Sequence, residues 1–434
     1  MNKKISIILL ITFFIFISIF SIFLIANLSH RSQKINLTFW GYNISPQIIQ
    51  PFIDAFEKQN PNIKISYYQK DINDYYNNLI DAFSNKNAPD IFLIYGSWLP
   101  LFDNHLYPLN LNKDSQINQR FIENNYPPII KQELITDKYL RGIPLSIDTL
   151  VLYYNPAIFN ESNISKPPRS WQDLLPLIAK LKRVNKEGQI TRAAIALGTS
   201  NVNWQSDILA NLMLQVGSDI SDPSQKIFTF LNIPPNSPIN IPPAVFAFSS
   251  YTQFANPKSQ FYNWNQNLSD SSLKAFCEGK TAMILAYAQD KKFIDAYCPD
   301  LSYKIYPFPN INPTIFYGRT TNLVVNNESK YPDLAWKFLK FLATKEMSEL
   351  YLKLNNVPPA RLDLIQTSLS DPFLNIFASQ ALLSKSWYQF NYQIINEAFN
   401  KAVIEIINNQ SINNILSVLS NLAEYLQQQW RNQN

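Results

Sequence analysis

The stretch INLTFWGYNISPQIIQPFIDAFEKQNPNIKISYY, residues 35–68, has the pattern of a strand, a helix and a second strand. Its beginning, INLTFWG, is typical of a strand. Ser45 followed by Pro46 marks a helix start, and apolar side chains recur at helical spacing until Pro61 stops the helix. The end, NIKISYY, alternates as a second strand does. The stretch therefore predicts an amphipathic helix between two strands.

The same pattern continues along the chain. A second helix is expected over about residues 74–84, and PDIFLIYG, residues 89–96, is typical of a strand buried on both faces. Strand, helix, strand, helix, strand predicts an α/β fold with a parallel sheet and right-handed crossovers. In such sheets ligands bind beyond the carboxyl ends of the strands, where this chain carries WGYN and YGSW. Aromatic side chains are therefore expected at the ligand-binding edge.

One carboxylate, Asp148, lies in the otherwise uncharged run PLSIDTLVLYY, residues 144–154, which is typical of a buried strand. An unpaired charge in a core costs several kcal/mol. Asp148 is therefore expected either to have a protein partner, such as a buried arginine or a helix terminus, or to face a cleft where a ligand supplies the partner. The sequence leaves both alternatives open.

Composition narrows the function classes. The chain has 434 residues, enough for two or three domains, and its 46% hydrophobic content excludes a disordered chain. The net charge of +5 is scattered without a basic block, which argues against nucleic-acid binding. Two histidines and two cysteines leave little for a metal site, so neither metal nor cofactor is expected. Whether Cys277 and Cys298 form a disulfide stays open, because spacing does not show how close they lie.

The amino terminus carries a long uncharged segment, residues 5–28. At about 1.5 Å per residue, a helix of this length crosses a hydrocarbon core of about 30 Å. A cleaved signal peptide is the alternative, but its apolar region is usually about 7–15 residues long. No cysteine follows the segment, so lipid anchoring is excluded. We expect residues 1–34 to form an uncleaved signal anchor with a transmembrane helix.

The middle of the chain mixes helix signals with long loops. In PPRSWQDLLPLIAKL, Ser170 and Asp173 form a capping box that is expected to open a helix, which Pro176 should kink or shorten. The Pro-rich and Asn-rich residues 221–243 predict a surface connection.

The last third of the chain is expected to be mainly helical. YPDLAWKFLKFLATKEMSELYLKL, residues 331–354, predicts one long amphipathic helix or a helix pair. Helical patterns then continue through Trp387 and Tyr388 to the carboxyl terminus.

Seven motifs together resemble the extracellular solute-binding proteins of ABC transporters, close to the sugar-binding, maltodextrin-binding type of family 1. The resemblance covers about residues 35–410. The motifs occur in the order of that family: LTFWG, PFIDAFEKQNPNIKISYY, APDIFLIYGSWLPLFDNHLYPLN, GIPLSIDTLVLYYNPAIF, PPRSWQDLL, AFCEGKTAMILAYAQD and YPDLAWKFLKFLATKE.

The resemblance implies two doubly wound lobes joined by hinge crossovers, as in type II periplasmic binding proteins, which close over a solute in the cleft between them. Lobe 1 would comprise residues 35–147 plus 320–362, and lobe 2 residues 148–319 plus 363–434. The protein would be a monomer at the extracytoplasmic face of the cell membrane. It would capture a carbohydrate and deliver it to the permease subunits of an ABC transporter, without catalytic residues.

The resemblance also implies a set of ligand-binding residues. Aromatic faces stack on sugar rings, and polar side chains bind the hydroxyls. Asp148 matches an acidic position that faces the sugar in the maltodextrin branch, and Trp387 matches a tryptophan carried on a helix. After GKTAMIL, where the family usually has a tryptophan, this chain has Tyr287 and Gln289 instead. The full set is Trp40, Tyr42, Asn43, Tyr95, Trp98, Asp148, Trp204, Tyr287, Gln289 and Trp387.

Two other functions compete with solute delivery. A membrane-tethered sensor or adhesion protein could use the same bilobal fold to report ligand occupancy to a partner. A glycoside hydrolase would need two carboxylates about 5 Å apart for retention, or about 6.5 to 9.5 Å apart for inversion. No spaced pair of acidic residues in the sequence suggests such a site.

Overall fold

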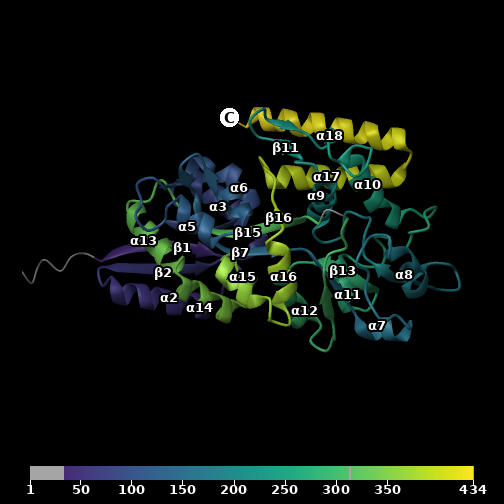
Figure 1. The fold of residues 1–434 in the computed structure, drawn as a ribbon, viewed down its shortest axis with the longest axis horizontal. Coiled ribbons are helices and arrows are strands. Elements are labelled where there is room, and N and C mark those ends of the chain that lie inside the picture. Colours follow the sequence, from purple (N-terminus) through teal and green to yellow (C-terminus); the bar gives the residue numbers. More distant parts are fainter. Residues whose placement is uncertain (1–33, 312–313, 434) are drawn as a thin grey trace, which may run out of the picture.

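The computed structural model describes residues 34–311 and 314–433. Nearly all of the predicted signal anchor, residues 1–34, lies outside the described residues. Among the helices of the described ranges, none combines the length and apolar character that a membrane crossing requires. Two α/β halves lie side by side, each built on its own sheet (Figure 1). We refer to the elements packed on the six-stranded sheet as lobe 1 and to those packed on the five-stranded sheet as lobe 2.

The sheet of lobe 1 has the strand order β16-β15-β3-β1-β2, with β7 also paired to β15. Strand β1 runs parallel to β2 and to β3, so the predicted parallel unit is confirmed. Strand β15 runs antiparallel to β3 and β7. The strands are β1 (Ile35–Gly41), β2 (Ile63–Gln69), β3 (Ile91–Tyr95), β7 (Gly142–Thr149), β15 (Phe316–Val325) and β16 (Ser384–Lys385).

Helices cover the lobe 1 sheet much as the sequence predicts. Helix α2 begins after Ser45 and ends before Pro61, and it buries Phe52 and Phe56. The segment 331–354 forms a helix pair, α13 and α14, rather than one long helix. The helices of this lobe include α2 (Pro46–Gln59), α3 (Ile72–Ser84), α4 (Leu99–Phe102), α5 (Gln119–Asn125), α6 (Pro128–Leu134), α13 (Pro332–Leu342), α14 (Lys345–Asn355) and α15 (Leu362–Ser368), beside a small sheet of β4 (Leu109–Asn110), β5 (Ile135–Thr136) and β6 (Tyr139–Leu140).

The sheet of lobe 2 has the order β14-β8-β13-β10-β9, formed by β8 (Val151–Tyr154), β9 (Arg183–Val184), β10 (Ile190–Ile195), β13 (Thr281–Ala286) and β14 (Lys304–Tyr306). Helix α9 is buried along its whole length, and α17 and α18 run along the outer side of the lobe (Figure 1). The helices of this lobe include α7 (Pro156–Glu161), α8 (Leu174–Leu181), α9 (Gln205–Gln215), α10 (Pro243–Thr252), α11 (Ser272–Cys277), α12 (Lys291–Tyr297), α17 (Tyr392–Asn408) and α18 (Ile412–Asn432). Strands β11 (Ser221–Asp222) and β12 (Ile227–Phe228) form a separate two-stranded sheet. A disulfide between Cys277 and Cys298 joins α11 to the end of α12.

The chain crosses between the lobes at two neighbouring strands. Ile147 packs in the core of lobe 1, whereas Leu150 packs in the core of lobe 2. Strand β15 crosses in the same way, because Tyr317 belongs to the lobe 2 core and Leu323 to the lobe 1 core. Helix α16 (Leu374–Ala381) also contacts both cores.

The predicted opening of a helix by a capping box at Ser170 and Asp173 was wrong. Asp173 does accept a hydrogen bond from the backbone N–H of Ser170 at 3.0 Å, but α8 begins only at Leu174. Pro176 therefore lies in the first turn, where its missing N–H has no intrahelical partner to lose and it causes no kink.

Trp387 does not lie on a helix. It follows β16, which pairs with β15, and it precedes α17, whose start is set by the Asn391 side chain as it accepts the N–H groups of Gln393 and Ile394. The N-cap at Asn391 keeps Trp387 outside α17.

Candidate functional site

Asp148 lies where β7 leaves lobe 1, and its carboxylate joins the two lobes. Oδ1 accepts hydrogen bonds from the backbone N–H groups of Thr149 at 2.9 Å and Ala288 at 3.1 Å. Oδ2 accepts one from Gln289 at 3.3 Å. Ala288 and Gln289 begin the short 3₁₀ helix η4 (Ala288–Asp290), directly after β13 of lobe 2. Asp148 therefore has the helix-terminus partner that the sequence left open, and it also faces a cavity.

This cavity, the Asp148 pocket, measures about 300 Å³ and lies between the lobes. Lobe 1 contributes the ends of β1 and β3 and the turn after α14, while lobe 2 contributes η4 and the start of α12. Five of the residues predicted from the sequence line it: Tyr42, Asn43, Tyr95, Asp148 and Gln289. Polar neighbours that the sequence analysis did not select line it too, among them Ser146, Lys292, Arg319, Thr321 and Asn355.

Arg319 lies opposite Asp148 in the register of β15 and β7. Its guanidinium carbon is 3.6 Å from the ring centre of Tyr95, 4.5 Å from that of Trp204 and 5.4 Å from that of Tyr287. Tyr95 comes from lobe 1, and the other two rings come from lobe 2. The cation therefore connects aromatic faces of both lobes, and each such contact contributes about 0.5 to 2 kcal/mol.

Further aromatic contacts extend this cluster in each lobe. In lobe 1, the ring of Tyr95 lies 5.0 Å from that of Tyr42 and 5.0 Å from that of Trp98. In lobe 2, Trp204 lies edge-on to Tyr287 at 5.2 Å. A hydrogen bond of 2.9 Å from the Tyr95 hydroxyl to the Gln289 side chain crosses between the lobes.

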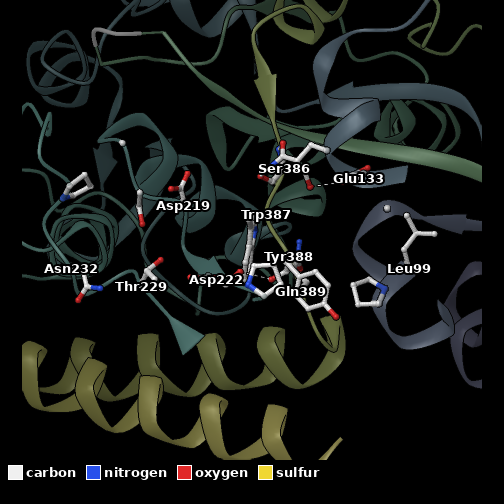
Figure 2. A pocket seen from close by; sticks show the side chains of 18 of the residues that line it. Leu99, Glu133, Asp219, Asp222, Thr229, Asn232, Ser386, Trp387, Tyr388 and Gln389 are labelled. Atoms are coloured by element: carbon white, nitrogen blue, oxygen red, sulfur yellow. Dashed lines mark hydrogen bonds between the residues drawn. The ribbon is translucent and has the colours of Figure 1, made fainter. Parts of the chain in front are cut away.

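Trp40 and Trp387 lie apart from this cluster. Trp40 lies under the ammonium group of Lys70, which is 3.9 Å from its ring centre, and it does not line the Asp148 pocket. Trp387 lines a second inter-lobe cavity of about 550 Å³, the Trp387 pocket, which Leu99 and Glu133 of lobe 1 also line (Figure 2). Its Nε1 is buried and has no hydrogen-bond partner in the described part of the chain.

The sequence analysis missed three charged residues at the centre of the site. Arg319 is the charged residue of the otherwise uncharged run TIFYGRTTNLVV, the same signal that selected Asp148. Asp290 accepts hydrogen bonds from Trp204 Nε1 at 2.6 Å and from the N–H of Tyr287 at 2.8 Å. Asp207 accepts one from the Tyr287 hydroxyl at 2.9 Å. No local pattern marks the bonds from Trp204 to Asp290 and from Tyr287 to Asp207, because these partners lie 86 and 80 residues apart.

Burial changes the protonation of these acids. It raises the pKa of Asp148 to about 7 and that of Asp290 to about 6, although hydrogen bonds to their carboxylates act in the opposite direction. Burial also raises the pKa of Asp207. Because a low-dielectric interior disfavours the charged form, the site holds carboxyl groups that are partly protonated near neutral pH.

We expect the protein to become more stable as the pH falls from about 7.5 to about 5. A carboxyl group whose pKa is raised binds its proton in the folded state before the unfolded state does, so the free energy of unfolding rises in this window. With a pKa of about 7 at Asp148, the part of this window below pH 7 contributes at most about 3 kcal/mol. Urea unfolding at both pH values measures the change. Asp148→Asn should reduce the slope, and an unchanged slope would contradict the assignment.

The sequence of this chain is similar to those of known extracellular binding proteins. The family described as "Bacterial extracellular solute-binding protein" matches residues 41–349. An ABC transporter extracellular-binding protein of Pyrococcus horikoshii is 28% identical over 168 residues, 38% of this chain and 37% of that protein. The sn-glycerol-3-phosphate-binding periplasmic protein of Shigella dysenteriae is 32% identical over 144 residues, 31% of this chain and 32% of that protein.

A solved structure resembles the whole described fold. The sugar-binding protein MalE from Xanthomonas citri superposes with a TM-score of 0.73 at 18% identity, over 92% of this chain and 100% of that one. This likeness extends the shared fold beyond the residues that the family match covers. With its two α/β lobes and the family match over most of its length, the chain belongs to the bacterial extracellular solute-binding protein family.

Proposed function

We propose that this protein captures a carbohydrate or a related polyol between its lobes and delivers it to the permease of an ABC transporter, without converting it chemically. The observation that carries the proposal is the position of the Asp148 and Arg319 contacts. Both residues lie on the strands that cross between the lobes, and each contacts the opposite lobe. Closure of the lobes over a solute would assemble this arrangement, and opening would take it apart.

The chemistry of the site supports a sugar-like solute. The rings of Tyr42, Tyr95 and Tyr351, all from lobe 1, line the pocket and offer apolar surface for C–H groups. Polar atoms come from both lobes, through Asn43, Asp148 and Gln289. The names of similar proteins support the same class, since MalE is a sugar-binding protein and the Shigella dysenteriae relative binds a phosphorylated polyol. The Pyrococcus horikoshii relative supports the link to an ABC transporter.

A thermal-shift screen of the full-length protein against glucose, maltose, longer maltodextrins and glycerol tests the proposal. A true ligand at 100 times its Kd should raise the free energy of unfolding by about 2.7 kcal/mol. The same ligand should make the particle more compact in small-angle scattering, because the lobes close. Absence of any shift would contradict sugar capture. Release of product from an oligosaccharide, abolished by Asp148→Asn, would instead support a hydrolase.

We also propose that residues 5–28 anchor the protein in the cell membrane as a monomer with both lobes outside. The support is the length of the uncharged segment and the extracellular family. The full-length protein, expressed in a bacterium, should pellet with the membranes, and added protease should degrade residues 35 onward in intact spheroplasts. A shortened protein that leaves the membrane fraction, beginning near Asn27, would show that the segment is cleaved.

A further inference from the structure

Arg319 carries hydrogen-bond donors that nothing in the described chain uses. The side chain is 6% exposed, yet it forms neither a hydrogen bond nor an ion pair with any described residue. A guanidinium group has five N–H donors and no acceptor. Because a buried donor without a partner is costly, this arrangement indicates that an acceptor is supplied from outside the chain.

The rings around Arg319 do not satisfy its N–H donors. Tyr95 and Trp204 lie 3.6 and 4.5 Å from the guanidinium carbon, distances typical of cation–π contacts. Such contacts supply no conventional hydrogen-bond acceptor, and the buried Nη1 of Arg319 has no hydrogen-bond partner among the described residues. Arg319 also lines the Asp148 pocket, from which a solute can reach it.

The acidic neighbours are already occupied by other donors. Asp148 accepts three backbone N–H groups. Asp290 accepts Trp204 Nε1 and a backbone N–H, and Asp207 accepts the Tyr287 hydroxyl. These carboxylates attract Arg319 electrostatically, and its positive charge in turn lowers the pKa values of Asp207 and Asp290. None of them accepts a hydrogen bond from its guanidinium.

The rest of the pocket adds positive charge. Lys291 lines the pocket but is paired with Asp295. Lys292 also lines it and donates to the backbone oxygen of Asn43 at 2.9 Å and to the side chain of Asn355 at 3.0 Å, both neutral groups. In the part of the chain that the structure describes, two cations of the pocket, Arg319 and Lys292, have no ion-pair partner. The acids of the pocket are Asp148, which is buried, and Asp295, which is already paired with Lys291.

We propose that the solute carries an oxyanion, a carboxylate or a phosphate, and that Arg319 binds this group in the Asp148 pocket. The inference rests on the proposed function, in which the solute binds between the lobes. An oxyanion presents two oxygens that match the fork of a guanidinium, whereas a neutral hydroxyl presents one and leaves donors unpaired. The solute class is then a phosphorylated sugar or polyol, or a sugar acid. Partial protonation of Asp148 near neutral pH reduces its repulsion of such a group.

Calorimetric titration of the full-length protein with glucose, glucose 6-phosphate and glucuronate tests the inference, because these ligands share one ring. We expect at least one charged ligand to bind at least tenfold tighter than glucose, and the one that does identifies phosphate or carboxylate as the group. Equal or tighter binding of glucose or maltose would overturn the inference and leave sugar capture intact. Absence of binding by every sugar and polyol would count against both proposals.

Variants locate the group that recognises the charge. Arg319→Gln should abolish the tenfold preference for the charged ligand, and Arg319→Lys should keep part of it, because charge remains without the fork. Arg120→Gln, on an exposed position of α5, should change nothing. If Arg319→Gln does not fold, the wild type and Arg319→Lys are compared instead. Inorganic phosphate, added at constant ionic strength, should stabilise the wild type against thermal unfolding more than it stabilises Arg319→Lys. A preference that survives Arg319→Gln, or equal protection of both proteins by phosphate, would overturn the inference.

Discussion

Replacing Trp204 with alanine should weaken solute binding by about 30-fold or more. Its ring covers one face of Arg319 and contacts Tyr287, and its Nε1 donates to Asp290. Trp204 does not itself line the Asp148 pocket, but its loss removes the support of Arg319, which does. A loss of about 2 kcal/mol in binding free energy corresponds to this change in Kd. Calorimetric titration with the ligand found in the thermal-shift screen measures the loss.

Two other tryptophans serve as comparisons. Trp40→Ala should leave the Kd unchanged, because its ring contacts Lys70, and neither residue lines the Asp148 pocket. Trp387→Ala should affect only solutes long enough to reach the Trp387 pocket. A loss of affinity for a single-ring solute in Trp40→Ala, or its absence in Trp204→Ala, would show that the site has been placed wrongly.

Removal of the disulfide, by replacing Cys277 and Cys298 with serine, should lower the free energy of unfolding by about 3 kcal/mol. The bond links residues 21 apart, and in the chain-entropy model a loop of this length restricts the unfolded chain by about that amount. The closed loop contains β13, η4 and Tyr287 between them, so it includes Tyr287, Gln289 and Asp290. Destabilisation should therefore be accompanied by weaker solute binding.

Urea unfolding of both proteins, with and without a thiol reductant, measures this effect. Reductant should lower the stability of the wild type to that of the double-serine protein and should leave the double-serine protein unaffected. Equal stability of the two proteins under oxidising conditions would show that the bond does not constrain the chain in solution.

Local patterns predicted the elements of lobe 1 well. The spacing of apolar residues and the Ser45–Pro46 start reproduce α2 nearly to the residue, and the apolar run of β3 is buried throughout. These features depend on neighbours within a turn or a strand, which a sequence displays directly. Where a more distant contact decided the outcome, the prediction failed. Pairing of β16 with β15, a contact between segments far apart in the chain, places Trp387 after a strand and before its expected helix. The N-cap at Asn391, by contrast, is a local signal that the prediction did not use.

The sequence by itself determined the family, the α/β fold and the unusual position of a carboxylate at Asp148, because ordered motifs and hydrophobic periodicity are properties of the chain. Only the tertiary structure decided what that carboxylate contacts and which cation stands opposite it. The Ala288 N–H that Asp148 accepts lies 140 residues away along the chain. Of the rings around Arg319, Tyr95 lies in β3, Trp204 is the N-cap of α9, and Tyr287 follows β13. Such contacts form when two separately folded sheets are brought face to face, so no pattern among neighbouring residues records them.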